Sequence, residues 1–425
     1  MIFQGKMISA DISGIKNIEK NVHLDFTNAT QLSGVFKEST VKTIYGPNGA
    51  GKTALIKAFA LYKKIVLLPN SLFNPLFQED FCGSVNKKTK TLRIALTIVS
   101  NESLIARYRH EIEIEANFED NSLTLTKETV LKYTASMAER IVIRAETGKV
   151  TECDDALLKE ELNKKTIRGS LLWDVIAILK SQGREEEKAA MPYLNLLLFA
   201  GNMTVVFANE ESVVYRKTQT IDELIQAVKE ESKNASKSDK YLAKIHKDRF
   251  GEYKKHIKVA ERFIRLIKPG LKRIEIQHSL VGSYQFVNLF FDYDAGEPID
   301  FEQESTGIKK IFSLCSAFEA LAKGGVVFID ELDAGVHDIV ISKLMEYACH
   351  YTQGQLIATT HHVDLMGAVL AKKHSIDFLS EDNVVTAWVR NGKYNPANAY
   401  MNGAIPHIVY NLFDFDFVDV FSESK

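Results

Sequence analysis

One stretch of eight residues, GPNGAGKT at Gly46 to Thr53, combines glycines with a lysine and a hydroxyl side chain. Glycines let successive backbone N–H groups converge on phosphate oxygens at the start of a helix. Lys52 can reach the β- and γ-phosphates of a nucleoside triphosphate, and the Thr53 hydroxyl can ligate Mg²⁺. A glycine-rich turn that matches the pattern by chance is the alternative. We predict a site for ATP and Mg²⁺ in which the phosphates are bound by Asn48, Gly49, Ala50, Gly51, Lys52 and Thr53 and the metal is bound by Thr53.

Two adjacent carboxylates, Asp330 and Glu331, end an apolar run at residues 326–329. Such a run predicts a buried strand, and the carboxyl ends of parallel strands face the ligand crevice of an α/β sheet. We predict that Asp330 holds the metal through water, and that Glu331 is a catalytic base for the attacking water. Solvated acids at a strand end are the alternative, which the phosphate loop in the same chain disfavours.

Two further segments could complete a nucleotide site. Residues 304–310, ESTGIKK, stand directly before a predicted apolar helix, where Ser305 could act only as a helix N-cap. Their functional interpretation is that Ser305 and the Gly307 backbone bind the γ-phosphate of a nucleotide held by a second subunit. His361 follows another predicted strand, which would place a catalytic imidazole beside the γ-phosphate. The intervening segment at 333–335 is a predicted subunit-contact loop.

The elements that must position these residues follow the periodicity of an α/β protein. An apolar strand at Val41–Tyr45 leads into the phosphate loop, and a helix-forming run at 54–68 leaves it. From about residue 91 to 153 apolar and polar residues alternate, which predicts antiparallel strands. After Pro269 the order of strands and helices is that of the second half of a nucleotide-binding sheet.

Helical spacing dominates the segment between these two halves, including a long helix predicted from Ser238 to Ile267 with one apolar stripe. The sequence therefore predicts an α/β fold: a P-loop NTPase sheet with an antiparallel β subdomain and a helical, coiled-coil-like insertion. Its predicted parts are an N-terminal half with the β subdomain at 1–153, the helical insertion at 154–269 and a C-terminal half at 270–425.

Charge and composition exclude several classes of protein. Hydrophobic residues make up 45% of the chain and charged residues 25%, as in ordinary globular proteins. The net charge of −2 gives no attraction of the whole molecule to nucleic acid. A local exception is the run at 243–273, with eleven Lys or Arg residues against three Asp or Glu. It is either a solvated helix face or a nucleic-acid contact.

The location of the protein is predicted from what the sequence lacks. The amino terminus has no basic start followed by an apolar stretch, and no apolar run approaches the length of a membrane span. The four cysteines are far apart and without metal-ligand spacing, as expected for reduced thiols. We expect a cytoplasmic protein without a membrane partner.

Taken in this order, the four segments resemble the ATP-binding cassette (ABC) class, in the soluble branch shared with chromosome-maintenance and DNA-repair ATPases. ESTGIKK departs from the leucine-led, double-glycine signature of transporters. This form is similar to bacterial AAA-type ATPases of phage defence: the overcoming-lysogenization-defect, abortive-infection, Septu and PARIS ATPase subunits. Further similarities are Phe73-Asn74-Pro75, YRHEIEIE at 108–115 and the tail AYMNGAIPHIVYNLFDFDFVDVF. Gln78 is a candidate for the glutamine of such ATPases.

The resemblance implies an ABC-type ATPase that closes as a homodimer, or a higher homo-oligomer, around ATP. It further implies that the ATPase regulates or scaffolds a separate effector, a nuclease or toxin, in antiviral defence. The stretch after His361 is too short for the Toprim nuclease of some relatives, and Asp414 and Asp416 suit an edge strand or docking segment better than a metal pair. A DNA-maintenance ATPase of the SMC-like class, which clamps nucleic acid, is the alternative. A transporter subunit ranks third.

Overall fold

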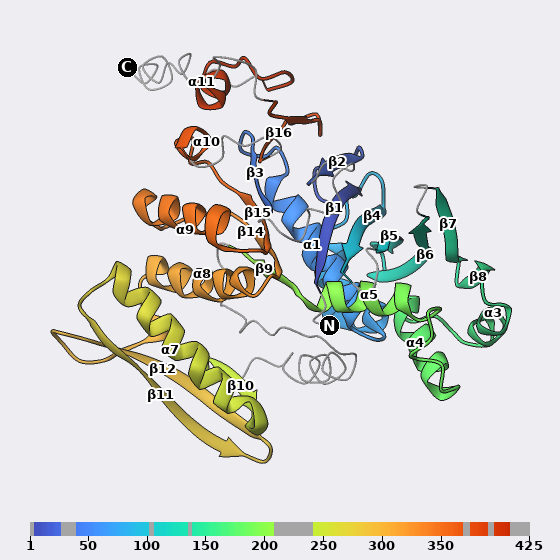
Figure 1. The fold of residues 1–425 in the computed structure, drawn as a ribbon, viewed down its shortest axis with the longest axis horizontal. Helices are drawn as coiled ribbons and strands as arrows, with labels where there is room; N and C mark the ends of the chain where they lie inside the picture. The colour runs from blue at the N-terminus through green and yellow to red at the C-terminus, as the bar shows by residue number, and fades with distance from the viewer. Residues whose placement is uncertain are drawn as a thin grey trace.

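The computed structural model describes residues 4–26, 40–101, 106–134, 138–207, 241–368, 375–389 and 395–408 of the 425-residue chain (Figure 1). The strands in these ranges form three sheets, of six, seven and four strands. The tail segment around Asp414 and Asp416, predicted as an edge strand or docking segment, lies outside the described residues.

The six-stranded sheet carries most of the residues singled out by the sequence. Its order is β17-β16-β3-β15-β14-β9, and all neighbours pair in parallel except β16 and β17. The strands are β3 (Thr40–Tyr45), β9 (Met203–Val206), β14 (Val326–Ile329), β15 (Gln355–Thr359), β16 (Ile376–Leu379) and β17 (Val385–Ala387). Near-continuous apolar runs are expected in a parallel sheet that helices cover on both faces. The predicted α/β sheet is confirmed.

Helices cover both faces of this sheet. One face packs against α1 (Lys52–Leu67), and the other carries α8 (Thr306–Ala322), α9 (Asp338–Tyr351), α10 (Leu365–Ala368) and α11 (Pro396–Met401). Because side chains of a strand point alternately to opposite faces, Val326 and Phe328 join one hydrophobic core, and Val327 and Ile329 the other. The Phe59 ring of α1 stacks on Phe328, with 4.2 Å between ring centroids.

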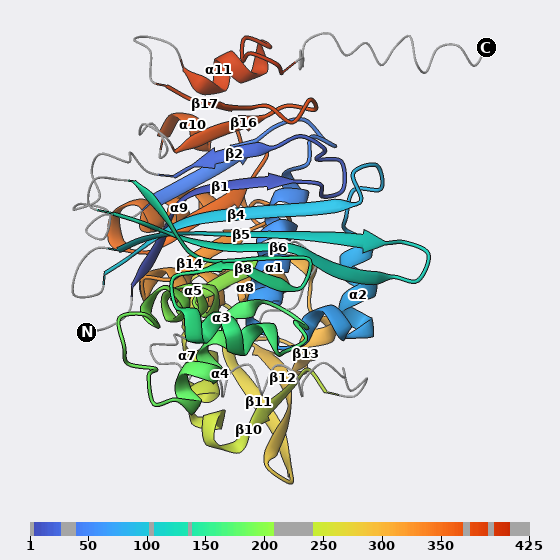
Figure 2. The ribbon, with the colours of Figure 1, turned by 90° about the vertical axis from the view of Figure 1, so that its right-hand side faces the viewer.

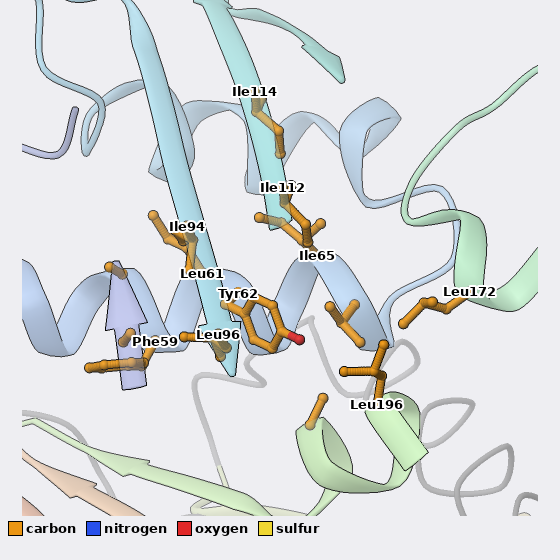
Figure 3. Packing of buried hydrophobic residues seen from close by; sticks show 14 of the residues in the cluster. Phe59, Leu61, Tyr62, Ile65, Ile94, Leu96, Ile112, Ile114, Leu172 and Leu196 are labelled. Carbon is orange, nitrogen blue, oxygen red and sulfur yellow. The ribbon is translucent and has the colours of Figure 1, made fainter. Parts of the chain in front are cut away.

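A seven-stranded sheet lies on the side of α1 opposite the six-stranded sheet (Figure 2). Its order is β2-β1-β4-β5-β6-β7-β8, antiparallel throughout. The strands are β1 (Gly5–Ser13), β2 (Val22–Asp25), β4 (Thr91–Ser100), β5 (Ala106–Asn117), β6 (Ser122–Tyr133), β7 (Glu139–Glu146) and β8 (Lys149–Cys153). Figure 3 shows Leu61, Tyr62 and Ile65 of α1 packed against apolar side chains of β4 and β5. The predicted antiparallel strands are confirmed.

One side chain ties the two large sheets together. The buried amide of Gln355 on β15 accepts from the Met7 N–H at 2.8 Å and donates to the Met7 carbonyl at 2.8 Å. Met7 lies at a bulge in the pairing of β1 with β4. The amide therefore satisfies backbone groups that the sheet leaves unpaired at that point.

The segment predicted to be helical holds helices and strands. It begins with α3 (Ala156–Asn163), α4 (Leu171–Ser181) and α5 (Met191–Gly201), as expected. β9 then pairs in parallel with β14 at the edge of the six-stranded sheet. A four-residue apolar strand cannot be distinguished by periodicity from a piece of buried helix, which is why the sequence pattern missed it. The division of the chain into three parts stays a prediction.

The long helix predicted from Ser238 to Ile267 is wrong in its first part. Residues Ala243–His246 form β10, a short 3-10 turn (η3, Lys247–Arg249) follows, and only then does α7 (Phe250–Ile267) begin. β10 pairs with β12, some forty positions later in the sequence, so a tertiary contact decides its conformation.

The third sheet packs against α7. It has the order β10-β12-β11, with β13 paired to β12. The further strands are β11 (Leu271–Val281), β12 (Tyr284–Tyr293) and β13 (Ile299–Asp300). The predicted apolar stripe of α7 is buried between this sheet and α8, with Phe250, Tyr253, Ile257, Ala260 and Ile264 in one core.

A buried polar network explains the motif at 108–115. His110 of β5 lies 2.9 Å from the Tyr62 hydroxyl of α1 and 2.9 Å from Glu128 of β6. Glu128 also accepts from the Ser170 hydroxyl at 2.6 Å and from the Leu171 N–H at 2.8 Å, at the start of α4. Glu128 is fully buried, so its hydrogen-bond donors replace the water that it loses on folding. The network joins α1 to the antiparallel sheet and α4.

Glu128→Ala should lower the free energy of unfolding by at least about 3 kcal/mol, because it leaves the buried donors of that network without an acceptor. Urea denaturation would measure the change. Glu152→Ala is the matched control: it removes the partner of Arg144 at the sheet surface and should change the stability by less than about 1 kcal/mol. An equally small effect for both variants would contradict the role given to Glu128.

Candidate functional site

The phosphate loop connects β3 to α1 and needs glycine for backbone reasons. Gly49 and Gly51 have φ values of +84° and +106°, in the region that side chains other than glycine rarely adopt. A Cβ atom on Gly46 would lie 2.3 Å from the Leu379 carbonyl oxygen, and one on Gly51 would lie 2.9 Å from Ile18. The loop is therefore held against both β16 and the turn that follows β1.

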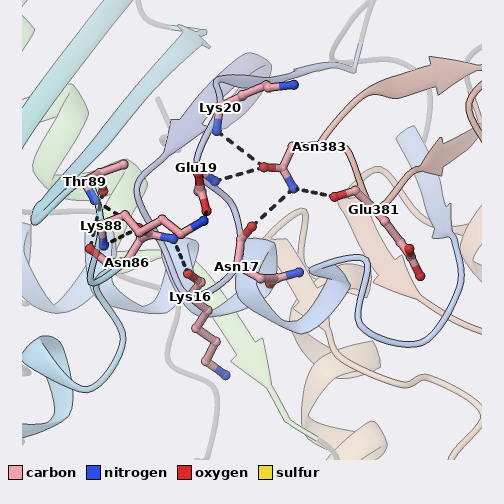
Figure 4. A network of polar contacts seen from close by, with 9 residues as sticks. All are labelled: Lys16, Asn17, Glu19, Lys20, Asn86, Lys88, Thr89, Glu381 and Asn383. Carbon is pink, nitrogen blue, oxygen red and sulfur yellow. Dashed lines mark hydrogen bonds and ion pairs between the residues drawn. The ribbon is translucent and has the colours of Figure 1, made fainter.

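That turn was not predicted to belong to the site. The Asn17 amide donates to the Gly49 carbonyl, while Asn383, beyond β16, accepts from the Glu19 N–H at 2.9 Å and from the Lys20 N–H at 3.4 Å (Figure 4). The Asn86 amide holds the same turn by donating to the Lys16 carbonyl at 2.6 Å. These contacts join residues remote in sequence, and no local pattern signals them.

Lys52, at the first position of α1, is a buried cation. Its Nζ donates to the carbonyl oxygens of Gly46 at 2.8 Å and Pro47 at 3.0 Å. Burial lowers the pKa of Lys52 to about 8, although the carboxylates of Asp330 and Glu331 oppose this shift. Since the ammonium is desolvated and close to loop backbone, an anionic phosphate group is a favourable partner for it.

Asp330 lies where three elements meet. Its Oδ1 accepts from the Thr53 hydroxyl of α1 at 3.2 Å and from the Thr359 hydroxyl at the end of β15 at 2.7 Å. Thr359 Oγ1 in turn accepts from the Glu331 N–H at 2.8 Å. The structure thus brings together Thr53, Asp330 and Glu331, which the sequence assigned to one site.

Glu331 has a left-handed backbone conformation with φ of +46°, which is uncommon for a residue other than glycine. With Thr53 and Asp330, it lines a cavity of about 520 Å³. A strained backbone that aims an exposed carboxylate into a cavity is typical of functional sites.

Residues of α2 (Pro75–Cys82) also line this cavity, and from this helix the sequence had offered only Gln78 as a candidate. Asn74 caps this helix and Pro75 occupies its first turn, which gives the motif Phe73-Asn74-Pro75 a structural role. Glu79 and Asp80 line the cavity, and Asp80 pairs with Lys57 of α1 at 2.8 Å.

Gln78, the candidate for the glutamine of related ATPases, does not line that cavity; its amide donates to the Leu72 carbonyl at 2.8 Å. Lys16, Lys57 and Phe207, which no sequence motif singled out, also line the cavity.

The segment at 333–335 contacts the residues that follow β15. Asp333 accepts from the Thr360 hydroxyl at 2.8 Å and from the His361 N–H at 3.3 Å. Burial and the nearby Lys52 cation lower the pKa of His361, which favours a neutral imidazole at pH 7. His361 is therefore close enough to Lys52 and to the carboxylates for their charges to act on its pKa. Its place beside a γ-phosphate stays a prediction.

Ser305 and Gly307 lie at the start of α8 and do not line the cavity described above. Ser305 caps the helix, with its hydroxyl accepting from the Ile308 N–H at 3.4 Å. A Cβ on Gly307 would lie 2.7 Å from the Gly335 carbonyl oxygen, so only glycine fits there. The predicted N-cap role of Ser305 is thus confirmed, and Ser305 is exposed.

The donor set fits a nucleotide phosphate with Mg²⁺. Lys52 and the loop N–H groups suit phosphate oxygens, and the oxygens of Thr53 and Asp330 are hard ligands. Among the described residues no group of three or more His, Cys, Asp or Glu side chains could hold a metal alone. Mg²⁺ needs none, because it keeps several waters and usually takes one or two carboxylates with substrate phosphates.

A parallel sheet with a phosphate loop after one strand, paired acids after a neighbouring strand and an antiparallel sheet across α1 defines the class as an ABC-type P-loop NTPase. The family model described as "AAA domain, putative AbiEii toxin, Type IV TA system" matches residues 43–367. The chain belongs to this family of AAA ATPase domains.

Solved structures with a similar arrangement share little sequence with the chain. The Smc head bound to the C-winged helix domain of ScpA is 14% identical, with a TM-score of 0.41, over 91% of this chain and 98% of that one. The recombination mediator protein RecF with ATP, of the RecFOR pathway, is 12% identical, with a TM-score of 0.43, over 92% of this chain and 99% of that one. No curated protein sequence matches the chain.

Among the helices in the described ranges, none is long and apolar enough to span a bilayer.

Lys52→Ala should weaken binding of a non-hydrolysable ATP analogue by at least about 100-fold, or about 2.7 kcal/mol, because the buried cation facing the phosphates is lost. Isothermal calorimetry would measure the dissociation constant. Lys63→Ala, on the same helix but about three turns away from the phosphate loop, should bind like the parent. If Lys52→Ala also binds like the parent, the phosphate loop does not hold nucleotide as inferred.

Proposed function

We propose that this chain binds ATP with Mg²⁺ and hydrolyses it, with Glu331 as the general base. The observation that carries the proposal is that Glu331 lines one cavity together with Thr53 and Asp330. Glu331 is held there by a hydrogen bond from its backbone N–H to Thr359. A base fixed by its backbone can orient a water without a further conformational change.

Each predicted residue has a distinct task in this proposal. Lys52 and the loop from Asn48 to Thr53 hold the phosphates, while Thr53 and Asp330 would hold the metal. Bound Mg²⁺ would neutralise charge on the phosphate oxygens. Glu331 accepts the proton of the attacking water, and neutral His361 can hydrogen-bond the γ-phosphate.

We further infer that the site is completed by a second copy of the chain. Ser305 and Gly307 lie outside the cavity of their own chain, yet they form the exposed start of a 17-residue helix. Backbone N–H groups at a helix N-terminus favour an anion. In a head-to-tail homodimer, these residues would meet the γ-phosphate held by the partner.

The dimer is proposed to regulate a separate effector in antiviral defence, in the cytoplasm. The support is the similarity of ESTGIKK to phage-defence ATPases and the family description, which names a toxin of a toxin–antitoxin system. ATP-dependent closure would present or withhold the effector, a nuclease or toxin. Hydrolysis would return the pair to the open state.

Glu331→Gln should bind ATP but lose at least about 100-fold in turnover, because the amide cannot accept the proton. With hydrolysis blocked, ATP remains bound and stabilises the closed pair by mass action. Size exclusion with light scattering should show a dimer in ATP-Mg and not in ADP-Mg, and phosphate release should be measured in parallel. Unchanged turnover would remove Glu331 as the base.

The second variant separates closure from binding. Adding Ser305→Arg to Glu331→Gln should abolish the ATP-induced dimer, since bulk and charge enter the shared site, while each chain still binds ATP. A dimer that persists in the double variant would mean that α8 does not contact the partner's nucleotide.

The alternative function, a nucleic-acid clamp, has one specific observation in its favour. On α7, the side chains of Lys254, Lys255, Lys258 and Arg262 are exposed, and within the described residues none pairs with a carboxylate. Lys254, Lys258 and Arg262 follow one another at four-residue spacing, so they share one face of the helix. A row of cations that no carboxylate of the described residues neutralises can contact a phosphate backbone, although Lys254 also lies over the Phe250 ring.

Changing Lys254, Lys258 and Arg262 together to Gln tests this alternative. If the row contacts DNA, the slope of log affinity against log salt should fall by about 0.7 to 0.9 per lost phosphate contact. Fluorescence anisotropy of labelled DNA at several salt concentrations would measure it. Equal slopes for variant and parent, or no DNA binding by the parent, would leave α7 as a solvated helix face.

A further inference from the structure

Lys310, in the second turn of α8, is a buried lysine that the mechanism above does not use. Its side chain is 4% exposed, and its Nζ donates to the backbone carbonyl of Asp330 at 3.0 Å. Burial lowers the pKa of Lys310 to about 8, against the opposing effect of Asp330, Glu331 and Asp333. Burying an ammonium group is costly, so a packing role alone would be served better by an apolar side chain.

The carbonyl that Lys310 contacts belongs to the peptide unit between Asp330 and Glu331. The N–H of the same peptide unit, that of Glu331, donates to Thr359 Oγ1 at 2.8 Å. Both polar groups of this one peptide are therefore fixed, the oxygen by α8 and the N–H by β15. Rotation of the peptide would break both hydrogen bonds at once.

This peptide unit determines where the Glu331 carboxylate points. Glu331 has a φ of +46°, a conformation that non-glycine residues leave readily unless their surroundings hold them in it. A peptide clamped on both sides supplies that restraint. Without one side of the clamp, Glu331 can relax to a negative φ, which would move its carboxylate relative to Thr53.

Ser305, at the N-terminus of α8, is exposed. Ser305 and Gly307 precede Lys310 on the same rigid helix, and Gly307 packs against the Gly335 carbonyl. A small shift of α8 at its N-terminus would therefore displace the Lys310 ammonium from the Asp330 carbonyl. The helix thus connects the surface proposed to meet the partner with Glu331, the chain's own proposed base.

We propose that Lys310 is a positioning residue that clamps the Asp330–Glu331 peptide and thereby couples the α8 N-terminus to the orientation of the Glu331 carboxylate. The inference rests on the proposed ATPase function. It adds a route within one chain by which closure against a second copy controls that chain's own turnover.

The test compares Lys310→Met with Lys323→Met, the same change at the exposed C-terminal end of α8. Lys310→Met should keep the dissociation constant for a non-hydrolysable ATP analogue within about threefold of the parent. Its kcat should fall between about tenfold and about 100-fold, because the base is misplaced. Lys323→Met should match the parent in both, and Lys310→Arg, which retains a donor, should recover part of the loss.

A readout independent of turnover is hydrogen exchange at the Glu331 amide. Lys310→Met should accelerate this exchange while the core of β14 stays protected, and Lys323→Met should not. Should Lys310→Met fail to fold, Lys310→Gln offers a shorter polar side chain for the same measurements. Parental kcat and parental exchange in a folded Lys310 variant would overturn the proposal, and so would an equal loss of ATP affinity and kcat. A parent chain that binds ATP without releasing phosphate would instead overturn the proposed function.

Discussion

The Asp330 carboxylate accepts hydrogen bonds from Thr53 of α1 and Thr359 of β15, and the geometry of the site depends on these two contacts. They hold the start of the phosphate-loop helix against the ends of two neighbouring strands. The hydroxyl that would bind the metal, the carboxylate that would share it and the base one residue later are thereby placed in one cavity. Parallel pairing of β14 with β15 makes this possible, since it brings their carboxyl ends to the same edge.

The rest of the fold supports that edge from both faces. α1 lies between the parallel and antiparallel sheets, with Phe59 stacked on β14 and Tyr62 hydrogen-bonded to the network around Glu128. On the other face, α8 brings a buried lysine to the Asp330 carbonyl. A shift of either helix would therefore reach the acids through direct contacts.

Unfavourable features concentrate at the site and are each compensated locally. Glu331 takes a left-handed conformation, and Lys52 and Lys310 are both buried cations with pKa values lowered to about 8. Backbone carbonyls accept from both lysines, and Thr359 restrains Glu331. Such arrangements destabilise an isolated chain slightly, and they provide preorganised charge where phosphate and water would react.

The sequence alone determined the phosphate loop, the buried strands that flank it, the paired acids and the antiparallel strands, because each depends on local spacing or alternation. It also predicted the strand that ends just before His361, which is β15. Only the tertiary structure decided that β9 joins the parallel sheet and that residues 243–246 form a strand. It also decided that Asn17 contacts the phosphate loop, while Asn383 holds the turn that carries Asn17. It likewise decided that Lys310 and Thr359 hold one peptide between them. These features arise from contacts between residues far apart in the chain, and no local pattern of side chains encodes such a contact.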